Sequence, residues 1–273
     1  MIWILGENGR LANAIYEEFE SESPLKIGRK DYLSWLDLSR EELESYFKLN
    51  LPSQSTLFIT SGIVDRGTAP EEIDQINRLL PIKILEACRN LDLRTVTVGS
   101  ISEHFNLLDD AYIRSKRELS SYVQNHAGNQ RNLHVRMHTL YGGTTFPHLN
   151  MFLGKVFESI QTHSEFRMSS GQQLREYHHI NDVARAMRSR LNKDCFGVWD
   201  LNTGKPIKLL NLAQAIFLSF DLPELVTISR EKDLEGDNLT RVFPETLNGL
   251  DVEFREPIQG VISYLKSMDR NFR

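Results

Sequence analysis

Short apolar runs alternate with amphipathic stretches through the first half of the chain. Residues 2–5 are all apolar, which is typical of a short buried strand, and apolar residues then recur at helical spacing over Arg10–Glu20. The same alternation predicts further strands at 25–27, 56–59, 94–98 and 133–137, and further helices beginning at Ser39 and spanning 71–90 and 111–125. Because strands that alternate with helices pair in parallel, the pattern predicts an α/β fold with a doubly wound parallel sheet and helices on both faces.

The pattern loosens after about residue 140. Helices are still predicted at 153–162, 181–192, 209–218 and 257–267, but irregular polar stretches separate them. We therefore predict one main domain over residues 1–140, with return segments near 178–202 that include a last strand at 198–201. A smaller α+β C-terminal lobe is predicted over residues 141–273.

Composition and charge exclude several classes of protein. The 273 residues carry 32 basic and 37 acidic side chains, a formal net charge of −5 without a long Lys/Arg run, which argues against a nucleic-acid partner. The apolar runs are far shorter than the roughly 20 residues that span a bilayer, and the first residues lack the basic start of a signal peptide. Cys88 and Cys195 provide neither a disulfide framework nor a metal-ligand spacing. We expect a cytoplasmic protein without a membrane partner or a bound metal.

A glycine-bearing turn joins the first predicted strand to the first predicted helix. Its sequence, Gly6-Glu-Asn-Gly9-Arg-Leu-Ala12, has the form G-x-x-G-x-x-A. Small residues in this position let the backbone approach a pyrophosphate, and the start of the helix supplies unpaired N–H groups and partial positive charge. The turn therefore indicates a dinucleotide site, although similar turns also join strands to helices in folds that bind nothing.

The residues after the second predicted strand indicate which dinucleotide would bind. An acidic side chain there accepts hydrogen bonds from the ribose of NAD, whereas a basic side chain suits the 2′-phosphate of NADP. Here the strand end reads Gly28-Arg29-Lys30, and Arg10 lies in the glycine turn itself. These cations favour NADP(H), with NAD as the alternative. In the other interpretation, Arg29 and Lys30 are ordinary solvated surface residues.

A tyrosine and a lysine lie four residues apart on the helix predicted at 111–125. Tyr112 and Lys116 would share one helix face, and Ser100 comes just after the strand that we expect to end at Val98. A phenol with a pKa of about 10 exchanges protons poorly near pH 7, but a neighbouring ammonium favours the phenolate and lowers that pKa. A serine at a strand end can hydrogen-bond the reacting oxygen. Chance often produces a Tyr-x-x-x-Lys spacing, so its position after a dinucleotide turn is what makes it informative.

Further segments follow in an order that matches one family. They are Asp37-Leu38, Thr60-Ser61-Gly62, Ile76-Asn77, Val96–Ser100, Val135-Arg136 with Leu140-Tyr141-Gly142, Arg175–Ala184 and Trp199–Gly204. With the glycine turn and the Tyr112–Lys116 pair, they resemble the extended short-chain dehydrogenase/reductases, the NAD(P)-dependent epimerases, dehydratases and ketoreductases. The resemblance runs through nearly the whole chain. It implies an NAD(P)-binding Rossmann domain over residues 1–140 and a substrate-binding lobe over residues 141–273.

The resemblance also implies a role for each matching residue. Tyr112 would donate or accept the proton, Lys116 would hold the nicotinamide ribose and lower the phenol pKa, and Ser100 would bind the carbonyl oxygen. The implied cofactor contacts are Gly6, Asn8, Gly9, Arg10, Leu11, Arg29, Lys30, Asp37, Leu38, Thr60, Ser61, Gly62, Asn77, Tyr112, Lys116, Thr139 and Leu140. Family members commonly pair as homodimers through the helices that carry Tyr112 and Asn77.

By the same resemblance, the substrate is a nucleoside-diphosphate sugar. A guanidinium suits phosphate geometry, so Arg175 is a candidate for binding the diphosphate, with a structural ion pair as its alternative role. Arg241 is a weaker phosphate candidate, and Ser102 is expected at the substrate site.

The segment between Ser100 and Tyr112 departs from the family pattern. Extended members usually carry a longer segment with a Tyr-Gly that lines the sugar site, so either Ser100 or Ser102 can be the catalytic hydroxyl. We choose Ser100, because its offset from Tyr112 is close to that of the shorter, single-lobe members. The 4,6-dehydratases have an Asp-Glu pair after the hydroxyl, whereas here Ser102 precedes Glu103, which disfavours dehydration.

We therefore predict an NAD(P)H-dependent oxidoreductase that reduces a keto group of a nucleoside-diphosphate deoxy sugar, with Tyr112 as the general acid. The cations that favour NADP(H) and a chain shorter than typical epimerases favour this interpretation. Two alternatives stay open: a nucleotide-sugar epimerase with tightly held NAD, and a non-catalytic NADP-binding sensor on the same fold.

Overall fold

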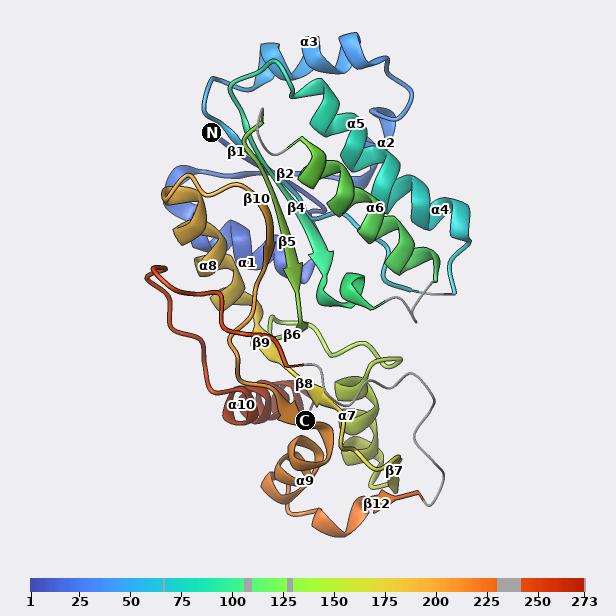
Figure 1. Cartoon of the computed structure of the whole chain (residues 1–273). Coiled ribbons are helices and arrows are strands. Elements are labelled where there is room, and N and C mark those ends of the chain that lie inside the picture. Colours follow the sequence, from blue (N-terminus) through green and yellow to red (C-terminus); the bar gives the residue numbers. More distant parts are fainter. Residues whose placement is uncertain (66, 106–109, 127–129, 230–241, 273) are drawn as a thin grey trace. The chain divides into compact units, whose positions relative to one another are not determined.

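The chain is divided into two units, each with its own core (Figure 1). The computed structural model describes residues 1–65, 67–105, 110–126, 130–229 and 242–272. The first unit comprises Met1–Met137 and Ala184–Leu201, and the second comprises His138–Val183 and Asn202–Arg273. Within the described ranges, no helix is long and apolar enough to span a bilayer.

A six-stranded sheet forms the centre of the first unit. Its strands are β1 (Ile2–Leu5), β2 (Leu25–Ile27), β3 (Thr56–Ile59), β4 (Arg94–Ser100), β5 (Asn132–Met137) and β10 (Gly197–Asp200). They lie in the order β10-β5-β4-β3-β1-β2, and every neighbouring pair is parallel. The predicted doubly wound parallel sheet is therefore confirmed, and the predicted return strand is present as β10.

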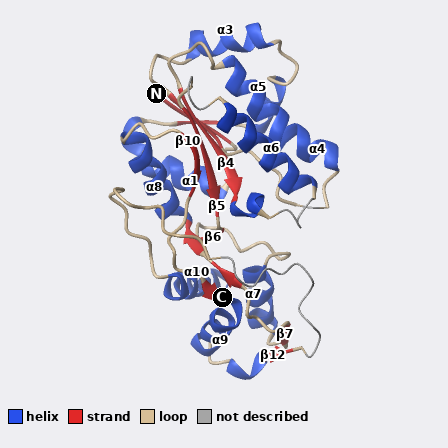
Figure 2. Ribbon diagram, in the orientation of Figure 1, coloured by secondary structure: helices blue, strands red, loops and turns tan. Residues whose placement is uncertain are grey.

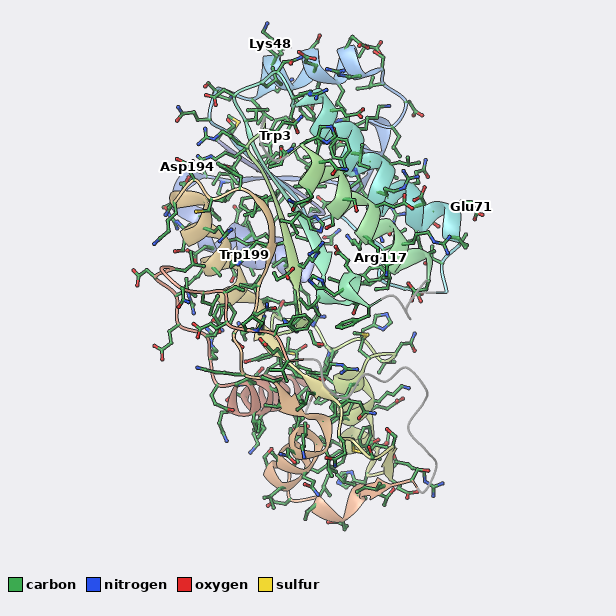
Figure 3. All side chains as sticks on the ribbon, in the orientation of Figure 1. Trp3, Lys48, Glu71, Arg117, Asp194 and Trp199 are labelled. Atoms are coloured by element: carbon green, nitrogen blue, oxygen red, sulfur yellow. The ribbon has the colours of Figure 1, made fainter. Side chains whose placement is uncertain are left out.

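Helices cover both faces of this sheet. They are α1 (Arg10–Glu18), α2 (Arg29–Ser34), α3 (Arg40–Asn50), α4 (Pro70–Asp74), the π-helical turn η2 (Gln75–Leu79), α5 (Leu80–Ala87), α6 (Ala111–Asn125) and α8 (Ile180–Asn192), with the 3₁₀ turns η1 (Glu20–Glu22) and η3 (Ile101–His104). In Figure 2, α1 and α8 lie on one side of the strands, and α5 and α6 lie on the other. Exposed charged side chains such as Lys48 and Glu71 point outward (Figure 3).

Apolar side chains from the helices meet those of the strands in the core of the first unit. Leu43 and Phe47 of α3, Leu57 of β3, and Leu80 and Ile84 of α5 are fully buried in one cluster. Each helix contributes one apolar stripe to this core. The strands of a parallel sheet are buried on both faces, which explains why β1 is a continuous apolar run without polar alternation.

The strand order reverses next to β1. The chain passes from β1 to β2 on one side and later enters β3 on the other side of β1. In open parallel sheets, ligands bind at such a reversal, outside the carboxyl ends of the strands. Gly6 follows β1 and Thr60 follows β3. The topology therefore brings the glycine turn and residues 60–62 to the same edge of the sheet.

The second unit combines helices with three pairs of short strands. The parallel pairs are β6 (Thr139–Tyr141) with β9 (Tyr177–His179) and β7 (Phe166–Met168) with β12 (Val226–Ile228), and β8 (Leu174–Arg175) is antiparallel to β11 (Ile207–Lys208). The helices are α7 (Phe152–Thr162), α9 (Leu209–Ser219), the 3₁₀ turn η4 (Pro223–Leu225) and α10 (Pro257–Phe272). Tyr141, Val156, Phe217 and Leu265 belong to one buried cluster. Two- and three-residue strands are too short to show a period of two, so the sequence analysis found only the helices.

The clearest differences between predicted and observed elements in the first unit lie at residues 29–34, 75–79 and 99–100. Residues 29–34 form a short helix, α2, where the sequence analysis expected only a strand end. The helix predicted at 71–90 is interrupted by the π-helical turn η2. The strand expected to end at Val98 continues to Ser100, because β4 pairs with β5 as far as Met137.

The start of α3 provides a test of its predicted serine cap. Ser39 Oγ accepts a hydrogen bond from Glu42 N–H at 3.2 Å, and the Glu42 carboxylate accepts one from Ser39 N–H at 2.7 Å. We expect Ser39→Ala to lower the free energy of unfolding by about 1 kcal/mol, because one helix N–H loses its acceptor. Urea denaturation measures this, with Ser45→Ala in the middle of the same helix as the control. Equal losses in the two variants would contradict a role for the cap.

Candidate active site

The turn after β1 has a conformation that lets it pack closely against the end of β3. Gly6 has a φ of +97°, which side chains disfavour, and a Cβ there would lie 3.2 Å from Ser61 N. Gly9 caps α1 without a side-chain hydrogen bond, and Asn13 N–H makes the bond to Gly9 O at 2.9 Å. The N–H groups in the first turn of α1 therefore have no helical acceptor and suit an anion.

The end of β3 lies against this turn. Thr60 Oγ1 donates a hydrogen bond to Leu5 O at 2.5 Å, which joins the ends of β3 and β1. Ser61 is 4% exposed, and its Oγ has no hydrogen-bond partner among the described residues. A buried hydroxyl of this kind is uncommon unless a ligand or water supplies the partner. This unpartnered hydroxyl lies where the glycine turn packs against the end of β3, the edge at which a dinucleotide is expected.

Charges of both signs surround the expected 2′-phosphate position. Gly28 caps α2, so Arg29 and Lys30 lie in the first turn of that helix and not at the end of β2. Arg29 forms an exposed ion pair with Glu72 at 3.0 Å. A Cβ at Gly28 would lie 3.0 Å from the carboxylate of Glu7. The cations that favour NADP(H) therefore share this place with two carboxylates.

The π-helical turn η2 positions Asn77, one of the expected cofactor contacts. Asn77 is fully buried, and its side-chain amide accepts from Ile63 N–H and donates to Ile63 O, both at 2.8 Å. A Cβ at Gly62 would lie 3.3 Å from Asn77 Oδ1 and 3.6 Å from Lys116 Nζ. Single π-helical turns often occur at functional sites. Gly62, Asn77 and Lys116 are therefore brought together at the carboxyl end of β3.

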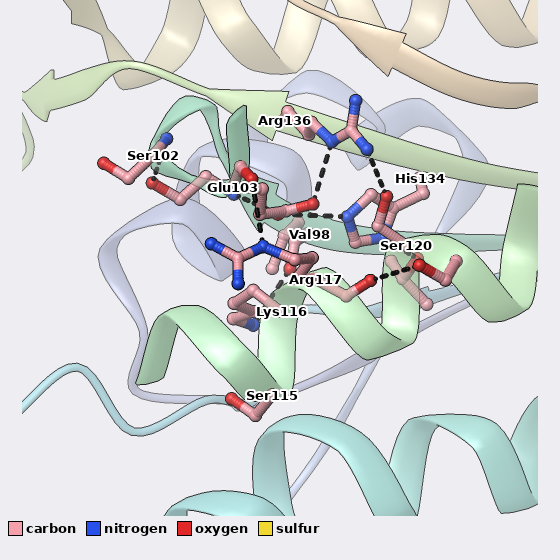
Figure 4. A network of polar contacts seen from close by, with 12 residues as sticks. Val98, Ser102, Glu103, Ser115, Lys116, Arg117, Ser120, His134 and Arg136 are labelled. Carbon is pink, nitrogen blue, oxygen red and sulfur yellow. Dashed lines mark hydrogen bonds and ion pairs between the residues drawn. The ribbon is translucent and has the colours of Figure 1, made fainter. Parts of the chain in front are cut away.

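Lys116 places a buried ammonium beside the ends of β3 and β4. The residue is 4% exposed, and its Nζ donates a hydrogen bond to Val98 O at 2.9 Å (Figure 4). Burial lowers the pKa of this ammonium to about 8, against the opposing effect of the Glu103 charge. Tyr112 is half-buried and lies one turn earlier on α6, in the turn that Asp110 caps. The helix predicted at 111–125 is confirmed, so Tyr112 and Lys116 share one face of it.

Both candidate hydroxyls lie at the carboxyl end of β4. Ser100 is the last residue of the strand, and Ser102 follows in η3. Ser102 N–H donates a hydrogen bond to Ser100 Oγ at 3.2 Å, and Glu103 accepts one from Ser100 N–H at 2.7 Å. Both serines are partly exposed. The choice of Ser100 as the catalytic hydroxyl stays a prediction.

Comparison with known proteins identifies the family. The sequence profile of the NAD dependent epimerase/dehydratase family matches residues 18–199. The chain belongs to this family. The predicted resemblance to the extended short-chain dehydrogenase/reductases is thereby confirmed. A search of curated proteins found no match.

Solved structures with a similar fold include several members of the epimerase/dehydratase family. One is the UDP-N-acetylglucosamine 4-epimerase of Methanobrevibacter ruminantium, with 14% identity, coverage of 99% of this chain and 98% of that chain, and a TM-score of 0.78. Another is the dTDP-4-dehydrorhamnose reductase of Clostridium acetobutylicum, with 17% identity, coverage of 98% of this chain and 99% of that chain, and a TM-score of 0.70. A third is the dTDP-glucose 4,6-dehydratase of Bacillus anthracis, with 13% identity, coverage of 99% of this chain and 96% of that chain, and a TM-score of 0.74. The first was solved with UDP-N-acetylmuramic acid and the third with NAD. At these identities, the likeness concerns the fold.

The sequence analysis missed a buried polar cluster behind Ser100 and Lys116. The Glu103 carboxylate lies 2.8 Å from Arg136 Nε and 3.4 Å from His134 Nε2. Burial raises the pKa of Glu103, but hydrogen bonds from His134, Ser100 and Arg136 outweigh burial and hold that pKa below its usual value. A signal was present in the sequence, because two polar residues at alternate positions of β5 lie on the same face of a strand that should be buried.

Three expected site residues belong to the second unit. Thr139 and Leu140 lie on β6, which pairs with β9. Arg175 lies on β8 opposite Ile207, and its Nη1 donates a hydrogen bond to Leu174 O at 2.8 Å. Their roles toward cofactor and substrate stay predictions.

A buried carboxylate joins two segments by which the chain matches the family. Glu176 accepts hydrogen bonds from Thr203 N–H at 2.7 Å, from Thr203 Oγ1 at 2.6 Å and from Gly204 N–H at 3.2 Å. His178 Nε2 lies 2.9 Å from the same carboxylate. Burial raises the pKa of Glu176, but the hydrogen bond from His178, the charge of His138 and the bonds from Thr203 outweigh it and lower the pKa to about 2. This contact gives the signature segment around Arg175 a structural role.

The remaining candidates are dispersed. Asp37 is exposed and Leu38 half-buried between α2 and α3, and Asn8 is exposed in the glycine turn. Arg241 lies outside the described residues. In the part of the chain that the structure describes, no group of three His, Cys, Asp or Glu residues could hold a metal ion.

The buried ammonium predicts a specific dependence of stability on pH. The pKa of Lys116 is about 8 in the folded chain, against an ordinary value of 10.5, so the unfolded chain binds more protons between these values. Stability therefore rises with pH as the folded-state ammonium loses its proton. Between pH 7 and pH 10, we expect the unfolding free energy of the native chain to rise by roughly 2 kcal/mol more than that of the Lys116→Met variant, in which this group cannot titrate.

Chemical denaturation at several pH values measures this difference. Lys48→Met is the control, because Lys48 is exposed and water solvates its ammonium in the folded and unfolded chain alike. Parallel stability curves for the native chain and Lys116→Met would contradict a depressed pKa at this residue.

Proposed function

We propose that the protein is an NAD(P)H-dependent reductase that acts on a keto group of a nucleoside-diphosphate deoxy sugar. The observation that carries the proposal is the position of Lys116 Nζ, bonded to Val98 O and beside Gly62 at the ends of two strands. Tyr112 lies one turn away on the same helix, and Ser100 ends β4. Membership of the epimerase/dehydratase family supports this class of chemistry.

Each of the three side chains has a distinct task in this reaction. When bound, the reduced nicotinamide supplies a hydride to the carbonyl carbon. Ser100 donates a hydrogen bond to the carbonyl oxygen, and Tyr112 gives its proton to that oxygen. Lys116 stabilises the phenolate that remains, because an ammonium lowers the pKa of a neighbouring phenol. Gly6 lets the turn after β1 pack against Ser61, and Gly62 leaves room for Asn77 and Lys116.

Reduction agrees with the surroundings of Glu103 better than dehydration does. A dehydratase needs an acidic side chain that can exchange protons with the substrate. The Glu103 side chain is 1% exposed and is held by Arg136 at 2.8 Å, with a pKa below its usual value. The Glu103 carboxylate is buried and bonded to Arg136, so a sugar cannot reach it.

We assign two residues to the substrate, as the family resemblance suggests: Arg175 to the diphosphate and Ser102 to the sugar. A guanidinium binds phosphate oxygens in a bidentate manner, which suits the diphosphate of such a substrate.

The phenol of Tyr112 is the group whose removal tests the reaction. We expect Tyr112→Phe to lower turnover by about 100-fold or more while the affinity for the cofactor stays nearly unchanged, because only the proton transfer is lost. The measurement is NADPH oxidation with a nucleoside-diphosphate 4-keto-6-deoxy sugar. Tyr122→Phe removes a phenol from the same helix and should leave turnover intact. Equal turnover in the Tyr112 variant would exclude this residue as the acid.

The cations around the glycine turn lead us to propose NADP(H) as the preferred cofactor. The ion pair of Arg29 with Glu72 is exposed and therefore weak, so Arg29 can turn to a 2′-phosphate. We expect NADPH to bind more tightly than NADH, and Arg29→Ala to reduce that preference by about tenfold, since a charge-assisted hydrogen bond is lost. Titration calorimetry with both cofactors measures this. Arg89→Ala removes an equal, exposed charge as the control. Tighter binding of NADH, unaffected by Arg29→Ala, would indicate NAD as the cofactor.

The fold similarity to UDP-N-acetylglucosamine 4-epimerase supports epimerisation as a second candidate. An epimerase restores its cofactor in every cycle. Tightly retained NAD in the purified protein, with sugar interconversion but no net cofactor oxidation, would favour it over reduction. Cofactor binding without any turnover of a sugar nucleotide would favour a sensor.

A further inference from the structure

A single carboxylate connects four elements of the first unit behind the candidate active site. Glu103 lies on η3, and its side chain accepts hydrogen bonds from Ser100 N–H at the end of β4 and from Arg136 Nε on β5. Arg136 Nη2 in turn donates to Ser120 Oγ on α6 at 2.5 Å. In Figure 4, Glu103 lies between Arg136, His134 and the helix that carries Lys116. The carboxylate therefore lies between the strand that ends in Ser100 and the helix that positions Lys116.

The hydrogen-bonding pattern defines the charge state of this cluster. Burial lowers the pKa of His134, although the hydrogen bond and charge of Glu103 raise it, so the imidazole is neutral. A carboxylate can only accept, so Nε2 carries the proton toward Glu103 at 3.4 Å, and Nδ1 accepts from Thr97 Oγ1 at 2.8 Å. Glu103 keeps its negative charge, since Arg136 and Ser100 N–H also bind it.

The negative charge of Glu103 acts on the buried ammonium of Lys116. Among the described residues, Glu103 on η3 and His134 on β5 interact electrostatically with Lys116, and Tyr112 lies one turn away on the same helix. The charge of Glu103 opposes the effect of burial on the ammonium. Of these groups, Glu103 is the one that favours the charged form of Lys116.

Gly99 shows that the chain makes room for this carboxylate. A Cβ at position 99 would overlap both Glu103 Oε1 and His134 Nε2. Gly99 does not belong to the glycines with a positive φ. Its backbone conformation alone therefore does not require a glycine. The space is kept for the carboxylate and the imidazole.

We propose that Glu103 is a positioning residue that fixes the backbone of Ser100 and keeps Lys116 positively charged beneath Tyr112. It acts on the reaction through these two residues and does not touch the substrate. The proposal rests on the proposed function for the chemical roles of Ser100 and Lys116. Its electrostatic part concerns Lys116 alone and can be measured without substrate or cofactor.

The experiment is a titration of Lys116 by NMR in chains labelled with ¹³C-lysine. Lys116→Arg identifies the signal, and circular dichroism confirms that each variant is folded. We expect Glu103→Gln to lower the pKa of Lys116 by roughly one pH unit, because the amide keeps the shape but removes the charge. Glu118→Gln is the matched control: it removes one negative charge from α6, where Glu118 is half-exposed and pairs with Arg78 at 3.0 Å. An unchanged pKa in Glu103→Gln, or an equal fall in both variants, would overturn the proposal.

Turnover provides an independent readout of the positioning of Ser100. Glu103→Asp keeps the charge but is too short to reach both Ser100 N–H and Arg136, so we expect a nearly native Lys116 pKa with turnover reduced at least tenfold. Native turnover in this variant would overturn the positioning role, and the variant also tests the proposal if Glu103→Gln does not fold. If the native chain turns over no keto sugar nucleotide, the proposed function fails, while the lysine titration still decides whether Glu103 controls Lys116.

Discussion

The candidate site depends on keeping the ammonium of Lys116 out of water. The fall of its pKa from 10.5 to about 8 means that the buried charge destabilises the folded chain by roughly 3 kcal/mol at neutral pH. The carbonyl of Val98 and the charge of Glu103 reduce this penalty without removing it. An apolar side chain would fill the same space without such a cost. A charge kept in an unfavourable place is therefore best explained by what it does to the neighbouring phenol.

Two glycines leave room for the buried side chains of Lys116 and Glu103. Gly62 leaves room for Lys116 and Asn77, and Gly99 leaves room for Glu103 and His134. The π-helical turn η2 brings Asn77 far enough inward to hold both backbone groups of Ile63. These features lie at the ends of β3 and β4, on the edge of the sheet where the strand order directs a ligand. The sheet topology and the two buried charged side chains, Lys116 and Glu103, therefore meet at the same edge.

Much of this arrangement could be predicted from the sequence. The strands at 25–27 and 56–59 and the helix at 111–125 have the predicted bounds, because short, largely apolar segments and helical periodicity are local signals. The glycine turn was also found, since its conformation is set within a few residues. The proximity of Lys116 to Gly62 is a finding of the structure.

The features that were missed depend on contacts between distant segments. Glu103, His134 and Arg136 look like unrelated polar residues until β4 and β5 pair. The ion pair of Arg29 with Glu72 joins residues on separate helices, which no local pattern reveals. The expected homodimer, cytoplasmic location and NADP(H) preference stay predictions.

The buried cluster also explains how chemistry and specificity can be separated in this fold. The residues that contact Glu103 lie on β4, β5 and α6 of the first unit, and Glu103 itself lies on η3. Groups held by packed strands and helices keep their geometry better than groups on loops. Arg175 lies on β8 of the second unit, whereas Ser102, the other expected substrate contact, lies on η3 of the first unit. Under the proposed function, Arg175 belongs to a different unit from the cluster around Lys116, so a substitution of Arg175 would change sugar-nucleotide binding without removing a member of that cluster.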